Sequence, residues 1–188
     1  MSIRHAMIAI AVVGSVFILE SHIHVVRAEF GIGIGAAEEA SRNASAKLNM
    51  GISDFHLMLA ALDRKDLESA EKFRTRAVEE ISSAAAAYKE AASKAGQRPL
   101  KPIIQGEDEA RDVATFSNMA KIYKSPEPYT EQSVLTTASD IVAKFQIILG
   151  SAKLSPLSRN ERGQQTLLNQ ALELQSFLSA TTTMLHVG

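Results

Sequence analysis

Apolar residues recur at alternating spacings of four and three along most of the chain after residue 36, which is the pattern of amphipathic helices. We expect four long helices, over residues 36–62, 66–95, 131–149 and 159–186, and a short helix over 107–124. Their apolar seams are, in chain order, Leu48, Ile52, Phe55, Leu59 and Leu62; Leu67, Ala70, Ala77, Ile81, Ala84, Tyr88, Ala91 and Ala95; Val113, Phe116, Ala120 and Tyr123; Val134, Ala138, Ile141, Phe145 and Ile148; and Leu167, Ala171, Leu174, Leu178, Thr181 and Leu185.

Helix-boundary signals separate these segments. An aspartate in "DRKD" (residues 63–66) can cap the second helix, and Thr130 can cap the fourth, by accepting hydrogen bonds from free N–H groups. Gly96 is expected to stop the second helix in a left-handed conformation. Ser158 and Glu161 match the S-x-x-E capping box before the last helix.

The short breaks inside each pair of long helices predict two antiparallel hairpins. The expected fold class is therefore all-α: an elongated antiparallel helical bundle of four long helices, with one short helix in the connection between the two hairpins. We expect residues 36–188 to form this bundle as a single domain. A flexible, glycine-rich N-terminus over residues 29–35 should precede it, because closely spaced glycines disfavour a helix start.

The first 28 residues have the composition of a signal peptide. Residues 6–19 are 14 uncharged, mostly apolar positions, within the length of a signal-peptide core and short of the roughly 20 residues of a spanning helix. Val26 and Ala28 occupy the −3 and −1 positions that signal peptidase favours, which predicts cleavage between Ala28 and Glu29. The protein would then be exported, periplasmic or secreted. The alternative is an uncleaved N-terminal anchor that holds the bundle to the inner membrane.

Charge and composition disfavour some partners. The chain carries 20 basic and 21 acidic side chains spread along its length, so no basic surface for nucleic-acid phosphates is evident. Aromatic residues make up only 5% of the chain and Trp is absent, which leaves few stacking platforms for single-stranded nucleic acid. A chain without cysteine has no disulfides, no thiolate nucleophile and no cysteine ligands for zinc or iron–sulfur clusters. We expect no nucleic-acid partner.

Sequence motifs for catalysis and cofactors are missing. A di-iron bundle requires Glu-x-x-His on two helices, whereas residues 53–56 read Ser-Asp-Phe-His. A non-covalent haem needs two axial ligands from His and Met. His56 and His186 would lie near opposite ends if the first and last helices are antiparallel, and towards one end if a spanning third helix makes them parallel. The G-x-S-x-G and phosphate-loop motifs are also absent, so we expect no enzyme, no metal and no cofactor.

The surface is the remaining place for function. The connection over residues 97–130 carries Tyr123 and Tyr129, aromatic residues of the kind favoured at interface anchors. The last helix is uncharged after Glu173 apart from one histidine, which predicts either bundle core or a homotypic or partner-binding face. We expect a bundle that acts by protein–protein interaction or self-association at the cell envelope. The alternative is a sensory bundle that binds a small molecule between helices near residues 82–87.

Overall fold

The computed structural model describes residues 36–125 and 127–186, and over this part of the chain the fold is all-α, as the pattern predicted. The helices are α2 (Ala36–Asp63), α3 (Leu67–Lys94), α4 (Glu107–Ile122), α5 (Glu131–Ser151), α6 (Leu154–Leu157) and α7 (Glu161–Leu185). The four long helices and the short connecting helix correspond to the predicted segments. The single turn of α6 is an addition that the periodicity did not predict.

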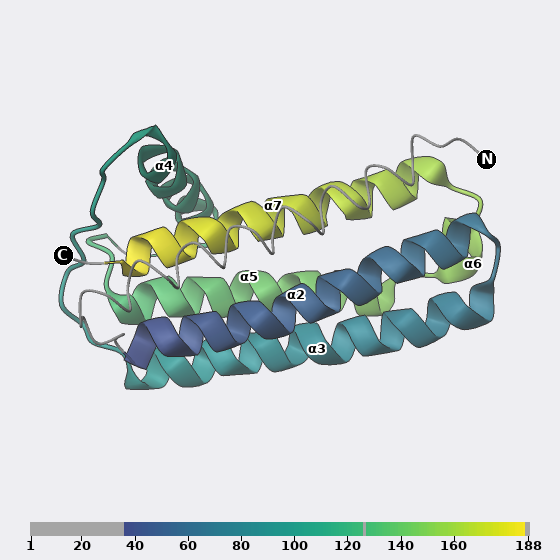
Figure 1. The fold of residues 1–188 in the computed structure, drawn as a ribbon, viewed down its shortest axis with the longest axis horizontal. Helices are drawn as coiled ribbons and strands as arrows, with labels where there is room; N and C mark the ends of the chain where they lie inside the picture. Colours follow the sequence, from purple (N-terminus) through teal and green to yellow (C-terminus); the bar gives the residue numbers. More distant parts are fainter. Residues whose placement is uncertain (1–35, 126, 187–188) are drawn as a thin grey trace, which may run out of the picture. The chain divides into compact units, whose positions relative to one another are not determined.

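The four long helices pack around one apolar core. α2 packs against α3, α3 against α5, and α7 against both α5 and α2. Consecutive long helices run in opposite directions (Figure 1). α4 packs against α7 beside the end of the bundle at which α3 finishes and α5 begins (Figure 1). The third helix therefore does not span the bundle, and α2 and α7 are antiparallel.

The predicted caps at two helix starts are confirmed. The Asp66 carboxylate accepts a hydrogen bond from the Ser69 N–H at 3.0 Å. Hydrogen bonding by the Ser69 side chain, and then by its N–H, lowers the pKa of Asp66 because it favours the charged form. At the start of α5, the Thr130 hydroxyl accepts from the Ser133 N–H at 3.1 Å. The Ser133 hydroxyl in turn accepts from the Thr130 N–H at 2.8 Å. Each bond satisfies an N–H near a helix start that has no partner within the helix.

The predicted left-handed stop at Gly96 was wrong. α3 ends at Lys94, and Ala95 is already in an extended conformation. Gly96 is instead held by hydrogen bonds to the start of α5: its N–H donates to the Glu131 carboxylate at 3.0 Å, and its carbonyl accepts from the Gln132 N–H at 3.2 Å. Contact with a residue 35 positions away therefore sets the conformation here, in place of a local cap.

The predicted capping box at Ser158 and Glu161 was also wrong. Asn160 caps α7 by accepting a hydrogen bond from the Gly163 N–H at 3.0 Å. The Ser158 hydroxyl donates to the Ser155 carbonyl at 2.8 Å, because Ser158 ends the preceding turn, α6. The last helix consequently begins at Glu161.

The predicted seams form the core. Each seam residue is buried or half-buried except Leu67, which is 40% exposed. The rings of Phe55 and Phe145 meet edge to face between α2 and α5, with centroids 5.9 Å apart. The small-residue stretch of α3 receives α5, where the Ser139 hydroxyl donates to the Ala85 carbonyl at 3.0 Å. Alanines on α3 therefore allow a close helix contact at this position.

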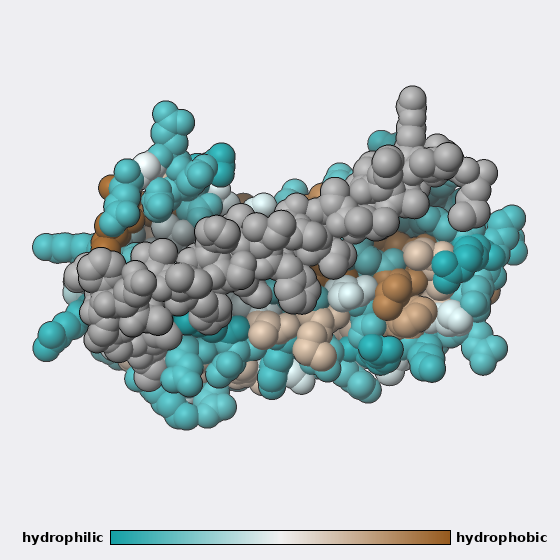
Figure 2. Space-filling view, in the orientation of Figure 1, coloured by the Kyte–Doolittle hydropathy of each residue, from teal (hydrophilic) through white to brown (hydrophobic). Residues whose placement is uncertain are grey.

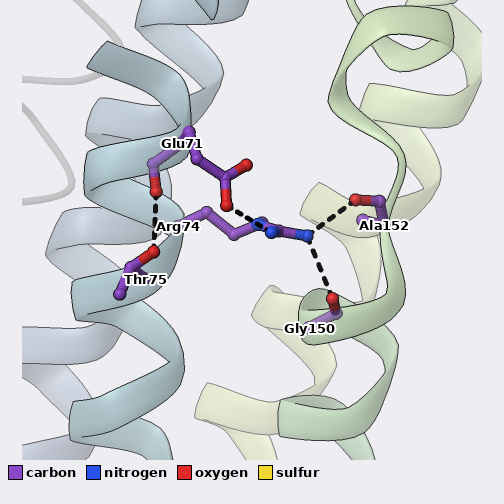
Figure 3. A network of polar contacts seen from close by, with 5 residues as sticks. All are labelled: Glu71, Arg74, Thr75, Gly150 and Ala152. Atoms are coloured by element: carbon purple, nitrogen blue, oxygen red, sulfur yellow. Dashed lines mark hydrogen bonds and ion pairs between the residues drawn. The ribbon is translucent and has the colours of Figure 1, made fainter. Parts of the chain in front are cut away.

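Arg74 of α3 links this helix to the end of α5. Its guanidinium Nη1 donates to the carbonyls of Gly150 and Ala152, each at 3.0 Å, and Nη2 pairs with Glu71 (Figure 3). Carbonyls at the end of a helix have no partner within the helix. Arg74 therefore caps the C-terminus of α5 from a neighbouring helix.

Candidate functional site

The connection between the two hairpins is closed at its base by backbone contacts. The Leu100 N–H donates to the Tyr129 carbonyl at 2.8 Å. Pro99 and Thr130 form an isolated antiparallel bridge beside this bond. Since the two ends of the connection meet, α4 and its flanking segments leave and rejoin the bundle at the same end (Figure 1).

Aromatic and polar contacts hold α4 against α7. Phe116 is fully buried and stacks on Phe177, with ring centroids 5.4 Å apart and an interplanar angle of 20°. The Asp112 carboxylate accepts hydrogen bonds from the hydroxyls of Ser179 at 3.1 Å and Thr183 at 2.8 Å. Hydrogen bonds to a charged acceptor are stronger than those between neutral groups. α4 is therefore docked on α7 by one aromatic and one charged contact.

Tyr129, one of the two predicted interface residues, is half-buried at this junction. Its ring packs edge-on against Phe116, with centroids 5.3 Å apart, and its hydroxyl donates to the Glu127 carboxylate at 3.0 Å. Burial, followed by the interaction with Glu127, raises the pKa of Tyr129 above its ordinary value. These contacts make Tyr129 part of the support of α4.

Tyr123, the other predicted interface residue, follows the last residue of α4 and is half-buried. The Lys144 ammonium of α5 lies 5.3 Å from the centroid of its ring, within cation–π range. The two tyrosines thus contact different neighbours, Tyr123 the ammonium of Lys144 and Tyr129 the ring of Phe116.

An apolar centre with basic neighbours adjoins Tyr123. Ile122 is 67% exposed, more than any other large apolar side chain in the described part of the chain. Lys121, directly before Ile122, and Lys124, two residues after it, are exposed, as is Lys144. We call Lys121, Ile122, Tyr123, Lys124 and Lys144 the α4-end patch. Ile122 was not among the predicted interface residues.

The two candidate haem ligands lie at opposite ends of the bundle. His56 is near the end of α2 that leads into α3, and His186 follows α7 at the other end (Figure 1). Burial beside Phe55 lowers the pKa of His56. The His186 N–H donates to the carbonyls of Thr182 and Thr183, which ends α7. Within residues 36–125 and 127–186, no three His, Asp or Glu side chains are grouped to hold a metal ion.

A groove of about 720 Å³ runs between the first part of α2 and the last part of α3. Its lining residues are Glu39, Ala40, Asn43, Ala46 and Lys47 of α2; Ala87, Glu90, Ala91 and Lys94 of α3; Ala95, which follows α3; and Glu131, the first residue of α5. Alanines supply much of the apolar lining, and charges of both signs accompany them. The stretch proposed for a ligand, residues 82–87, reaches this groove only through Ala87.

The predicted leader, with its cleavage point between Ala28 and Glu29, lies outside the described residues. Among the described helices, α5 is the one long and apolar enough to cross a membrane. Half of its apolar window is buried inside the bundle, and a buried core helix meets the same criteria of length and composition.

Comparisons of this chain with protein-family models, with curated proteins and with solved structures found no match. On the described part of the chain, the surface features that stand out are the α4-end patch and the groove between α2 and α3.

Proposed function

We propose that the protein is an exported, non-enzymatic helical bundle that binds another protein at the cell envelope through the α4-end patch. The observation that carries this proposal is the 67% exposure of Ile122 beside the half-buried ring of Tyr123. Removing apolar surface from water is favourable by about 25 cal/mol per Å². An apolar centre surrounded by polar residues is also the usual anatomy of a protein–protein interface.

The basic rim indicates the charge of the partner. Lys121 and Lys124 flank Ile122 and Tyr123 in sequence, the Lys144 ammonium lies 5.3 Å from the centroid of the Tyr123 ring, and all three lysines are exposed. Complementary charges accelerate association and are screened by salt. The partner should therefore present acidic residues around an apolar pocket, and high ionic strength should slow its association.

A photo-crosslinking amino acid in place of Ile122 tests the proposal in cells of the natural source that express the full chain. The matched control carries the same amino acid in place of Ile147, which is 64% exposed on α5. We expect a covalent adduct with one protein at position 122, reduced by added salt, and none at position 147. Adducts that are absent at 122, or equal at both positions, would contradict the proposal.

Substitutions in the patch separate binding from stability. Ile122→Ser changes a largely exposed side chain, so it should weaken adduct formation from a crosslinker at Tyr123 without changing the midpoint of unfolding. Tyr129→Ala is a poor test, because Tyr129 supports Phe116 and its loss mixes the two effects. An Ile122→Ser chain that captures the partner as well as the parent does would remove Ile122 from the interface.

Export is the second part of the proposal, and it rests on the predicted cleavage between Ala28 and Glu29. Cleavage leaves 188 − 28 = 160 residues. Intact mass spectrometry of the protein recovered from the envelope of its source should give the mass of residues 29–188. A full-length mass in the membrane fraction would favour the anchored alternative.

The groove between α2 and α3 supports the alternative function, binding of a small molecule. Its alanines and mixed charges suit a small amphipathic compound. Native mass spectrometry of the same recovered protein should show added non-covalent mass if a ligand is bound. In a thermal-shift screen, a ligand at 100 times its dissociation constant stabilises the fold by about 2.7 kcal/mol. A screen of envelope metabolites without any stabilisation would count against this alternative.

A further inference from the structure

The outward face of α2 carries a second seam. Ala46, Met50, Ser53 and Leu57 follow one another at spacings of four, three and four, and all four are exposed. Met50 is 57% exposed and Leu57 is 44% exposed. At 3.6 residues per turn, these positions lie opposite the core seam of the same helix. We call these four residues the α2 stripe.

The α2 stripe differs from an ordinary solvated helix face. α3 exposes charged residues such as Glu71, Lys72 and Arg76, whereas the α2 stripe contains no charge. In Figure 2, apolar residues gather along α2 above a border of hydrophilic residues. Depletion of charge, together with an exposed methionine, is typical of the centre of a protein interface.

We propose that the α2 stripe joins two copies of this chain about a two-fold axis, with their α2 helices antiparallel. In such an interface, if one residue contacts a second, the second contacts the first in return. An axis midway between positions 50 and 53 places Met50 against Ser53 of the second copy and Leu57 against Ala46 of the second copy. Each large side chain then faces a small one, which fills a helix contact without voids. A parallel pairing would place Met50 against Met50 and Ser53 against Ser53.

Charged residues near the two ends of α2 favour the same orientation. Glu39 precedes the α2 stripe and Arg64 directly follows α2, and both are exposed. The antiparallel pairing brings Glu39 of each copy towards Arg64 of the other, whereas a parallel pairing brings like charges together. A second copy therefore matches both the shape and the charge of this face.

Engineered cysteines test the pairing, because the chain has none of its own. Full-length chains carry Ala46→Cys and Leu57→Cys together, or either one alone, and are then oxidised. Within one helix these positions are 57 − 46 = 11 residues apart, about 16 Å along the axis. That is too far for an internal disulfide, whose Cα atoms lie about 4.4–6.8 Å apart.

The double variant should form covalent dimers, while each single variant should form few. Ser82→Cys, at an exposed position of α3, is the matched control and should also form few. Efficient cross-linking by either single variant would show a parallel or random encounter, and it would overturn the antiparallel pairing. A double variant that does not cross-link would overturn it as well.

The mass of the full chain in solution provides a second test. Sedimentation equilibrium should show a dimer, and Met50→Lys should raise its dissociation constant about tenfold or more, as expected for a central interface residue. Helix content should not change, because Met50 is 57% exposed. A dimer unaffected by Met50→Lys would overturn the proposal. A parent chain that is monomeric would also overturn the proposal, even if the reason is that residues 6–19 of the same chain cover the α2 stripe.

The α2 dimer and the partner bound at the α4-end patch use different surfaces, so their tests fail independently. A chain carrying Met50→Lys should still give the adduct at position 122 if only the dimer is lost. Loss of that adduct with an intact dimer would contradict the proposed function alone.

Discussion

Gly51 lies in the buried contact between α2 and α3, and an added methyl group has no room there. A Cβ at this position would lie 2.6 Å from Ile81 Cγ1, 3.1 Å from the Ala77 carbonyl oxygen and 3.2 Å from the Ile81 backbone nitrogen. Two of these three atoms belong to the backbone, so a rotamer change of Ile81 relieves only part of the clash. The two helices must therefore separate to accommodate alanine.

The expected effect of Gly51→Ala is a balance of two opposing terms. Alanine gains about 0.8–1.0 kcal/mol over glycine inside a helix. Adding a methyl group to a filled core costs about 1–3 kcal/mol. With about 2 kcal/mol for the clash and about 0.9 kcal/mol for the helix gain, the variant should lose about 1 kcal/mol of unfolding free energy.

Gly150→Ala is the matched control. Its Cβ would have Val78 Cγ2 as its nearest neighbour, at 3.9 Å, so the same chemical change should stabilise the chain by up to about 1 kcal/mol. Urea unfolding followed by circular dichroism measures both variants. Opposite signs are expected, and the cost of Gly51→Ala should shrink in an Ile81→Ala background. A Gly51→Ala chain as stable as the parent would refute the close approach of α2 and α3.

Other contacts give three further expected outcomes. Asp112→Asn should weaken both hydrogen bonds to α7 and lower the free energy that holds α4 on the bundle by about 1–2 kcal/mol. Amide exchange in α4 should then be faster, and unchanged exchange would contradict the docking role of Asp112. Asn160→Ala should lower the free energy of unfolding by about 1 kcal/mol, and Ser158→Ala by less than about 0.5 kcal/mol. A larger loss from Ser158→Ala than from Asn160→Ala would make Ser158 the cap of α7. Burial lowers the pKa of His56, so its imidazole binds a proton more readily in the unfolded chain than in the folded chain. The free energy of unfolding should therefore fall as the pH drops below about 6.5. Between about pH 7.5 and about pH 5, His56→Gln should therefore lose less stability than the parent, and an equal loss would rule out this contribution.

Two helix starts were predicted correctly from local caps, whereas the end of α3 and the start of α7 were predicted wrongly. Asp66 and Thr130 bond to N–H groups three residues away, so the sequence alone pointed to them. Gly96 was misassigned because its hydrogen bonds reach to Glu131, and Ser158 because an unpredicted turn precedes α7. A short-range pattern contains no information on a partner as distant as Glu131.

The candidate site was predicted only in part, for a related reason. Tyr123 and Tyr129 were identified by residue type, which does not tell how far each ring is buried. Ile122 was overlooked because it falls between the predicted seam residues Ala120 and Tyr123. Its off-seam position was the available signal, since an apolar residue off the stripe of an amphipathic helix faces solvent.

Local periodicity in the chain was enough to assign the all-α class, the four long helices and most of the core, because helix period and burial follow from residues a few positions apart. The neighbours of each helix, the end at which α4 docks and the separation of His56 from His186 depended on the tertiary structure. Arg74 shows the physical reason: it caps carbonyls 76 and 78 residues further along the chain, and only packing brings such groups together.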